Sequence, residues 1–320
     1  MSGLRILISG GNGYVGRPLT RLLSRKHEVC VVDSLRYGDW RFSDAERSQL
    51  RLEQLDIREG ERVAAVMRSF VPDVVIHLAA LHYIPECEKN PRLATAINVG
   101  GTVNLLGRCP PQSCFVFASS GAVYQPEAQP HREDESPLGA SDVYGLTKLQ
   151  GEAFVSDFAA KNCLKAVIVR LFNVVGPGET NPHLLPELVA QLKAGRKVVD
   201  LGNLTPERDY IHVLDAASGF AAVATGNRVS PGGKLVVNLG TSRAYSVAEV
   251  VSKLRAVSGI NFEVQQDASR LRKVDRPYLA ANIERISCQL DWRPERTIDD
   301  AIRDLWTDPD LADTLTAKYR

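Results

Sequence analysis

RILISGGNGYVG, residues 5–16, is an apolar run that ends in a cluster of glycines. A short run of this kind predicts a buried strand, and apolar side chains then recur at helical spacing up to Arg25. Glycines at positions 10, 13 and 16 allow a tight turn and a close approach of the backbone to a ligand. The N–H groups at the start of a helix suit a pyrophosphate. The segment therefore predicts a strand–turn–helix unit that binds a dinucleotide.

The alternation of strand and helix continues along the first half of the chain. Further strands are predicted at residues 28–33, 50–56, 73–78, 113–118 and 165–171, and helices at 59–70, 91–108 and 143–161. Near-continuous Val/Ile/Leu runs separated by helices are typical of a parallel sheet that is covered on both faces. The predicted fold class is therefore α/β, a Rossmann-type doubly wound parallel sheet.

The pattern changes beyond about residue 175, where Pro and Gly become frequent and the apolar segments shorten. This change indicates a second, smaller lobe of mixed α/β structure. We expect a dinucleotide-binding domain over residues 1–175, with segments at about 208–240 as candidates to return to it. Residues 176–320 are expected to form mainly the substrate lobe.

Composition excludes several classes of protein. The 320 residues are 44% hydrophobic and 24% charged, which is ordinary for a globular protein of about two domains. Lys+Arg 39 against Asp+Glu 38 provides no basic surplus for nucleic acid, and no apolar run approaches the ~20 residues of a membrane span. The six cysteines are scattered without a CxxC pair. We therefore expect a soluble cytoplasmic protein with no nucleic-acid or membrane partner and no metal site.

Asp33 ends the second predicted strand, about 20 residues after the glycine cluster. A carboxylate at this place accepts hydrogen bonds from the ribose hydroxyls of a dinucleotide and repels a 2′-phosphate. The predicted cofactor is therefore NAD, although the nearby Arg36 leaves NADP open.

Tyr144 and Lys148 lie four residues apart in a predicted helix and so share one face of it. A phenol titrates near ~10 in water and is a poor base at neutral pH. A neighbouring ammonium group and the positive nicotinamide ring favour the phenolate and lower that pKa. Ser120 follows the strand at 113–118 and is expected at the same edge of the sheet, where open α/β folds bind ligands.

Ordered motifs from about residue 5 to about residue 305 resemble the extended short-chain dehydrogenase/reductases, and most closely the nucleotide-sugar epimerases such as UDP-galactose 4-epimerase. The motifs are GGNGYVG, Asp33, Asp56-Ile57, HLAAL (77–81), NVGGT (98–102), SSGAVY (119–124), YGLTK (144–148), RLFNVVGPGE (170–179) and RDYIHVLD (208–215).

The resemblance implies roles for individual residues. Ser120, Tyr144 and Lys148 would be catalytic. NAD would be held by Gly10, Gly13, Tyr14, Val15, Gly16, Asp33, Asp56, Ile57, Leu78, Ala79, Ala80 and Asn98, together with Tyr144 and Lys148. The nucleotide sugar would contact His82, Ser120, Gly121, Tyr144, Asn173, His183, Leu184, Arg208, Arg272 and Asp275. The family also implies a homodimer that pairs the helices at about 91–108 and 143–161.

Gly121 and Ala122 separate the epimerases from one group of their relatives. Sugar 4,6-dehydratases of the family carry Asp-Glu at this place, and neither residue here can move a proton. An NAD-dependent 4-epimerase of a nucleotide sugar, with UDP-hexose as the expected substrate, is therefore favoured. A nucleotide-sugar oxidoreductase such as a 4-ketoreductase is the alternative, followed by a non-catalytic dinucleotide-binding relative. His82 stands where galactose epimerases commonly have lysine, so the sugar stays open.

Overall fold

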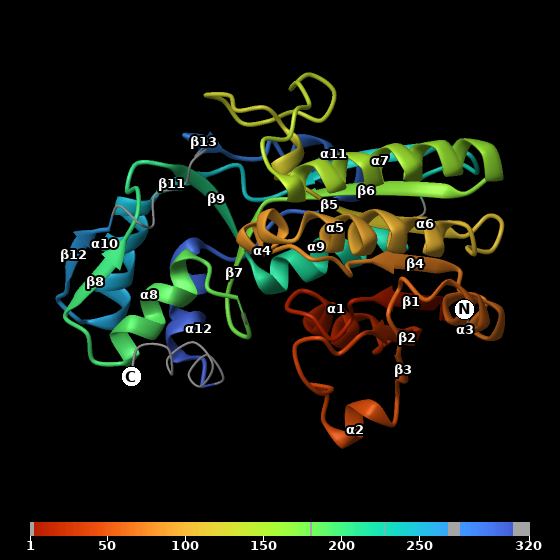
Figure 1. Cartoon of the computed structure of the whole chain (residues 1–320), viewed down its shortest axis with the longest axis horizontal. Helices are drawn as coiled ribbons and strands as arrows, with labels where there is room; N and C mark the ends of the chain where they lie inside the picture. The colour runs from red at the N-terminus through yellow and green to blue at the C-terminus, as the bar shows by residue number, and fades with distance from the viewer. Residues whose placement is uncertain (1–2, 180, 227, 268–275, 310–320) are drawn as a thin grey trace.

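The computed structural model describes residues 3–179, 181–226, 228–267 and 276–309. Its main feature is a sheet of seven parallel strands in the order β10-β6-β5-β4-β1-β2-β3 (Figure 1). The strands are β1 (Arg5–Ser9), β2 (Glu28–Asp33), β3 (Arg51–Gln54), β4 (Val74–His77), β5 (Cys114–Ser120), β6 (Lys165–Leu171) and β10 (Lys234–Leu239). The predicted fold class is confirmed.

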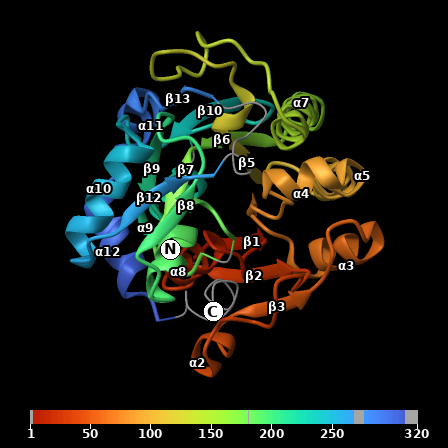
Figure 2. The ribbon, with the colours of Figure 1, turned by 60° about the vertical axis from the view of Figure 1, so that its left-hand side comes forward.

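Helices cover both faces of this sheet, because its strands are apolar on both sides. In β1, Ile6 and Ile8 belong to one buried cluster and Leu7 to another. The first cluster lies under α1 (Gly16–Leu23), α9 (Val213–Thr225) and α11 (Glu284–Leu290), and the second under α3 (Gly60–Phe70), α6 (Gly101–Leu106) and α7 (Val143–Asn162). Figure 2 shows α3 and α7 on one side of the sheet and α9 and α11 on the other.

The region predicted as one helix at 91–108 is broken into shorter pieces. After α4 (Ile84–Lys89) come α5 (Pro91–Thr95), a π-helical turn at Ala96–Gly100, and α6. A π turn inserts one extra residue into the helical repeat and is common next to functional sites. Here it carries Asn98, which is buried beside the cavity described below.

The smaller lobe is built around β9 (Glu207–His212), as Figure 1 shows on its left side. β7 (Asn173–Val175) and β13 (Tyr278–Leu279) pair with β9 in parallel, and β11 (Ala244–Ser246) pairs antiparallel to it. A separate parallel pair joins β8 (Val198–Leu201) to β12 (Glu263–Gln266). A second apolar core lies beneath α8 (Leu184–Lys193), α10 (Val247–Ser258) and α12 (Ile298–Thr307).

The chain crosses between the two lobes several times. β9 belongs to the smaller lobe, whereas α9 packs on α1 and β10 extends the large sheet beside β6. The strand order reverses between β1 and β4, and open α/β folds bind ligands at such a switch point. In the described part of the chain, no helix combines the length and apolar character needed to cross a membrane.

Candidate active site

A cavity of about 1060 Å³ lies between the carboxyl ends of the sheet strands and the smaller lobe. Its volume slightly exceeds the ~300–1,000 Å³ that is usual for small-molecule sites, so it offers space for a large ligand. The glycine turn, Asp33, the end of β5 and the start of α7 form one wall. The loop between β7 and α8, together with Arg208, forms the facing wall.

Two glycines of the turn are required by packing. Gly10 has φ +76°, and a Cβ added there would lie 2.6 Å from the backbone nitrogen of Ala79. A Cβ on Gly16 would lie 2.2 Å from the Gly10 carbonyl oxygen. A side chain at Gly10 would push the turn away from the loop after β4, and one at Gly16 would push α1 away from the turn. The turn thereby directs the N-terminus of α1 at the cavity, where its N–H groups suit an anion.

Asp33 presents its carboxylate to the cavity from the end of β2. The backbone N–H groups of Asn12 and Leu35 donate to its two oxygens at 3.1 and 2.9 Å. Burial raises the pKa of Asp33, and these two hydrogen bonds oppose the rise. Arg36, which left NADP open, forms an ion pair with Glu86.

Most of the predicted cofactor residues line the cavity, and one does not. Gly10, Gly13, Tyr14, Val15, Gly16, Asp33, Asp56, Ile57, Leu78, Ala79 and Ala80 all contribute to its wall. Asn98 instead lies behind the wall, and its side chain accepts from Leu81 N–H at 2.7 Å and donates to Thr147 Oγ1 at 2.9 Å. The arrangement gives no support to the predicted contact of Asn98 with NAD, which stays a prediction. Its amide is fully used in joining the loop after β4 to α7.

Ser120, Tyr144 and Lys148 meet at the end of β5. Ser120 ends that strand, and its Oγ accepts from the N–H of Ala122 at 3.1 Å. Tyr144 lies in the first turn of α7, and Lys148 follows one turn later. The Lys148 ammonium group lies 5.7 Å from the centre of the Tyr144 ring and donates to the carbonyl of Ala118 at 2.7 Å. All three side chains line the cavity.

The electrostatics of this group differ from the prediction in one respect. Burial raises the pKa of Tyr144 well above its usual value, and a hydrogen bond with Ser120 is the cause that lowers it. The Lys148 ammonium group donates to the Ala118 carbonyl. Burial lowers the pKa of Lys148 itself to about 8. In the protein without its cofactor, the net effect on the phenol is therefore a raised pKa, whereas the sequence led us to expect that Lys148 and the nicotinamide ring lower it.

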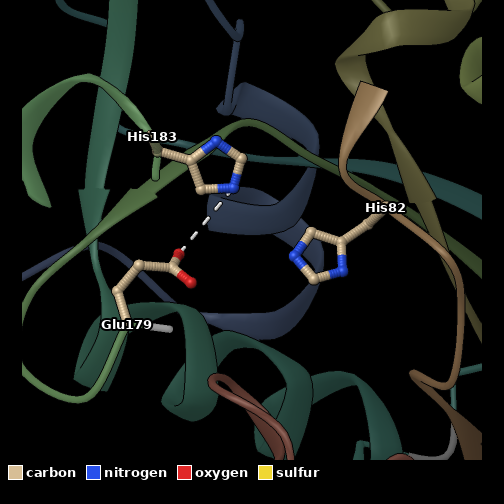
Figure 3. A group of neighbouring side chains, drawn as sticks. All are labelled: His82, Glu179 and His183. Carbon is tan, nitrogen blue, oxygen red and sulfur yellow. Dashed lines mark ion pairs between the residues drawn. The ribbon is translucent and has the colours of Figure 1, made fainter. Parts of the chain in front are cut away.

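The predicted substrate residues fall into two groups. His82, Gly121, Asn173, His183, Leu184 and Arg208 line the cavity together with Ser120 and Tyr144. Arg272 and Asp275 lie outside the described residues. Figure 3 shows His82 and His183 on opposite loops with Glu179 beside them, and the two imidazole ring centres are 6.0 Å apart.

Three polar residues of the cavity wall escaped sequence reasoning. Arg276 is buried and donates to the carbonyls of Gly121 and Ala122 at 3.2 and 2.7 Å, so it holds the loop that follows Ser120. Glu179 and Asn181 are also buried and face the cavity. The sequence around Glu179 and Asn181 has no helical or strand periodicity that would indicate their position. Only the structure shows that these two residues lie opposite His82.

His77 and His212, in contrast, are packing residues. The His77 ring contacts the hydroxyls of Ser9 and Thr102 at 2.7 and 2.9 Å, and burial lowers its pKa to about 3. His212 caps α9 through the N–H of Leu214.

The cavity with its glycine turn, acidic strand end and Ser/Tyr/Lys group defines a dinucleotide-dependent enzyme of the doubly wound α/β class. The sequence profile of the NAD dependent epimerase/dehydratase family matches residues 6–240. The chain belongs to this family, as its motifs predicted.

Relatives of known name agree with this assignment. The UDP-glucose 4-epimerase of Azospirillum brasilense is 34% identical over 91% of this chain and 87% of its own length. Among solved structures, UDP-glucose 4-epimerase from Stenotrophomonas maltophila, with bound NAD and formylated UDP-arabinopyranose, has a TM-score of 0.83 at 27% identity and covers 95% of this chain and 97% of that one. The enzyme from Bifidobacterium longum, in complex with NAD+ and UDP, has a TM-score of 0.82 at 28% identity, with 94% and 96% covered.

Proposed function

We propose that this chain is an NAD-dependent nucleotide-sugar 4-epimerase that acts on a UDP-hexose and inverts its C4 through a transient 4-keto sugar. The observation that carries the proposal is the group of Ser120, Tyr144 and Lys148 on the wall of a cavity large enough for a cofactor and a nucleotide sugar together. UDP-glucose 4-epimerase relatives over nine-tenths of the chain support the reaction and the substrate class.

The residues at the glycine turn fit NAD. The Asp33 carboxylate is fixed by two N–H donors and still has lone pairs for ribose hydroxyls, while it disfavours a 2′-phosphate. The N–H groups at the start of α1 are placed to donate hydrogen bonds to the pyrophosphate. Arg36 is paired with Glu86, so its guanidinium group is less available to bind the 2′-phosphate of NADP. When bound, NAD supplies the acceptor and donor for the hydride at C4 of the sugar.

The chain itself provides the proton chemistry and the positioning. Tyr144 removes the proton from the sugar O4 and later returns one, while Ser120 holds the same oxygen by a hydrogen bond. Lys148 lies beside the phenol, and its N–H donors other than the one used by Ala118 are proposed to bind the nicotinamide ribose. Arg276 holds Gly121 and Ala122, and these two residues offer neither the acid nor the base that elimination of water would need.

The second lobe is proposed to bind the nucleotide diphosphate. Asn173, His183, Leu184 and Arg208 face the cavity from that side. A guanidinium group matches two phosphate oxygens in its geometry, which suits Arg208 to this role.

We also propose a homodimer in a reducing, cytoplasmic compartment. Leu146 and Phe154 of α7 are exposed at 50% and 39%, which supports α7 as an apolar contact surface. All six cysteines are free, which supports the compartment.

The direct test is an incubation of purified protein with UDP-, dTDP-, GDP- and CDP-sugars without added cofactor. We expect a pair of C4 epimers to accumulate from a UDP-hexose, as followed by chromatography. Denaturation of the same protein should release NAD in near-stoichiometric amount. A requirement for added NADH with net reduction of the sugar would favour an oxidoreductase, and release of NADP would contradict the role of Asp33.

A further inference from the structure

Three side chains with metal-binding atoms converge where the loop after β4 meets the loop between β7 and α8 (Figure 3). They are His82, Glu179 and His183, and their ligand atoms all lie within 4.8 Å of one another. The Nε2 atom of His183 is 3.9 Å from Oε2 of Glu179, which is too long for a hydrogen bond. We propose that these three residues form a binding site for a divalent cation of the zinc class on the cavity wall.

The spacing of the three groups suits one shared ion. Zinc binds imidazole nitrogen and carboxylate oxygen at about 2.0–2.2 Å in tetrahedral geometry, so two ligand atoms of one ion are about 3.3–3.6 Å apart. The widest separation therefore needs to close by at most about 1.5 Å, through rotation of the half-buried histidine side chains. The 3.9 Å between Oε2 of Glu179 and Nε2 of His183 needs to close by only about 0.3–0.6 Å.

The donor set selects the class of cation. Two imidazoles and one carboxylate are typical ligands of zinc and related transition metals, whereas magnesium and calcium prefer oxygen. Three protein ligands leave a fourth position for water or for a ligand in the cavity, as in catalytic zinc sites. His82, Glu179 and His183 all line that cavity.

Neighbouring groups already orient two of these ligands. The N–H of Asn181 donates to Oε1 of Glu179 at 2.9 Å, which fixes the carboxylate with Oε2 toward His183. A backbone hydrogen bond to Ala80 engages the His82 ring. Such outer partners normally orient metal ligands. The side-chain amide of Asn181 lies 3.2 Å from Nε2 of His82, and the cation would replace that contact.

Charge also favours the site. The side chain of Glu179 is only 5% exposed, and a divalent cation compensates a buried carboxylate. The positive charge of Lys148 acts on His82 and opposes a cation, so it limits the affinity.

The proposal goes beyond the epimerase reaction and contradicts the expectation from the sequence that there is no metal site. It does not rest on the proposed function, because its test measures metal binding and needs no turnover. A protein that binds no metal could still be an epimerase, and a protein without epimerase activity could still bind the metal.

The test uses the full chain without a polyhistidine tag, freed of metal by a chelator and dialysed. We expect one equivalent of Co²⁺ to bind with the visible absorption of a low-coordinate site, and Zn²⁺ to displace it. Calorimetry with Zn²⁺ should yield the same stoichiometry.

Variants then locate the site. His183→Ala and Glu179→Gln should each weaken Zn²⁺ binding at least about tenfold, since even outer-shell changes cost ~10–100-fold. His82→Ala should do the same. The control is His27→Ala, which removes a histidine outside the cavity wall and should leave binding unchanged. Melting temperature and bound NAD show that each variant folds.

Several outcomes would overturn the proposal. They are a lack of stoichiometric binding, equal binding in the wild type and all three site variants, and the intense near-ultraviolet absorption of cobalt bound to cysteine thiolates. Because His183 is 39% exposed, its truncation leaves the fold intact and keeps the test decisive.

Discussion

Tyr144→Phe is the most informative perturbation of the proposed active site. It removes only the phenol oxygen, which forms a hydrogen bond with Ser120, and leaves the ring to fill the same space. Loss of one such hydrogen bond should change the free energy of unfolding by only about 0.5–1.5 kcal/mol. Loss of a positioned acid/base should lower kcat by about 10²–10⁴-fold, or about 3–5 kcal/mol in the activation barrier.

The pH dependence of the wild type carries the second part of this prediction. The reactive form of Tyr144 as a base is the phenolate, and burial raises its pKa in the protein. Activity should therefore rise as the pH increases, until the phenolate is fully formed in the enzyme with its NAD bound. In Tyr144→Phe the residual activity should lose this alkaline rise, because the titrating group is gone.

The assay is the conversion of a UDP-hexose to its C4 epimer, with substrate binding measured by calorimetry. We expect kcat to fall while binding of the nucleotide sugar and the content of NAD change little. Ser156→Ala, a hydroxyl deletion on the same helix outside the cavity wall, is the matched control and should keep full activity. Full activity of Tyr144→Phe would refute the assignment of the base and make His82 the next candidate.

Three further predictions concern stability and assembly. Lys148 is only 3% exposed, and burial lowers its pKa from 10.5 to about 8. Its charged form therefore lowers the free energy of unfolding at pH 7 by about 3 kcal/mol, and this cost disappears as the pH rises through 8 toward 10.5. Since the lost bond to the Ala118 carbonyl costs about 1–3 kcal/mol, cofactor-free Lys148→Met should unfold at pH 7 within about 2 kcal/mol of the cofactor-free wild type and should be the less stable of the two near pH 10, while the same variant loaded with NAD should lose activity; strong destabilisation at pH 7 alone would contradict this. Glu152→Ala removes the carboxylate that accepts two hydrogen bonds from the buried Arg170 guanidinium group, and it should lower the free energy of unfolding by about 3–5 kcal/mol in urea titrations. A change below about 1 kcal/mol would contradict this prediction. Leu146→Asp should shift the protein from dimer to monomer in light scattering, and a wild type that is already a monomer would contradict the proposed assembly.

The large sheet could be predicted because its strands are buried on both faces. A strand such as Val74–His77 has no polar alternation to confuse with a surface element, and a glycine directly follows each of its two neighbours, β1 and β5. The strand at 50–56 was predicted too long at both ends, since β3 lies at the edge of the sheet and only Arg51–Gln54 pair with β2. The π turn at Ala96–Gly100 could not be predicted, because an extra residue in a helical turn leaves the apolar pattern nearly unchanged.

Site residues near the glycine turn were predictable for a related reason. Asp33 and Ser120 end strands of one parallel sheet, and the carboxyl ends of parallel strands meet at one edge. Asn98 shows the limit of that argument. The family motif NVGGT (98–102) implied a cofactor contact, but the amide is used by Leu81 and Thr147, and only side-chain geometry distinguishes a residue that touches a ligand from one that holds the wall.

The facing wall of the cavity was the least predictable part, for a reason that lies in the chain topology. Arg276 reaches Gly121 across 155 positions of sequence, and Asn181 reaches His82 across 99. Neither contact follows a strand or helix period, because both arise where loops of the smaller lobe close over the end of the sheet. A pattern within one element indicates what that element buries, whereas the pairing of two loops depends on how the two lobes pack. Such packing brings together polar groups, among them Glu179, that no motif assigns to the site. These groups are the main addition that the structure makes to the chemistry predicted from the motifs.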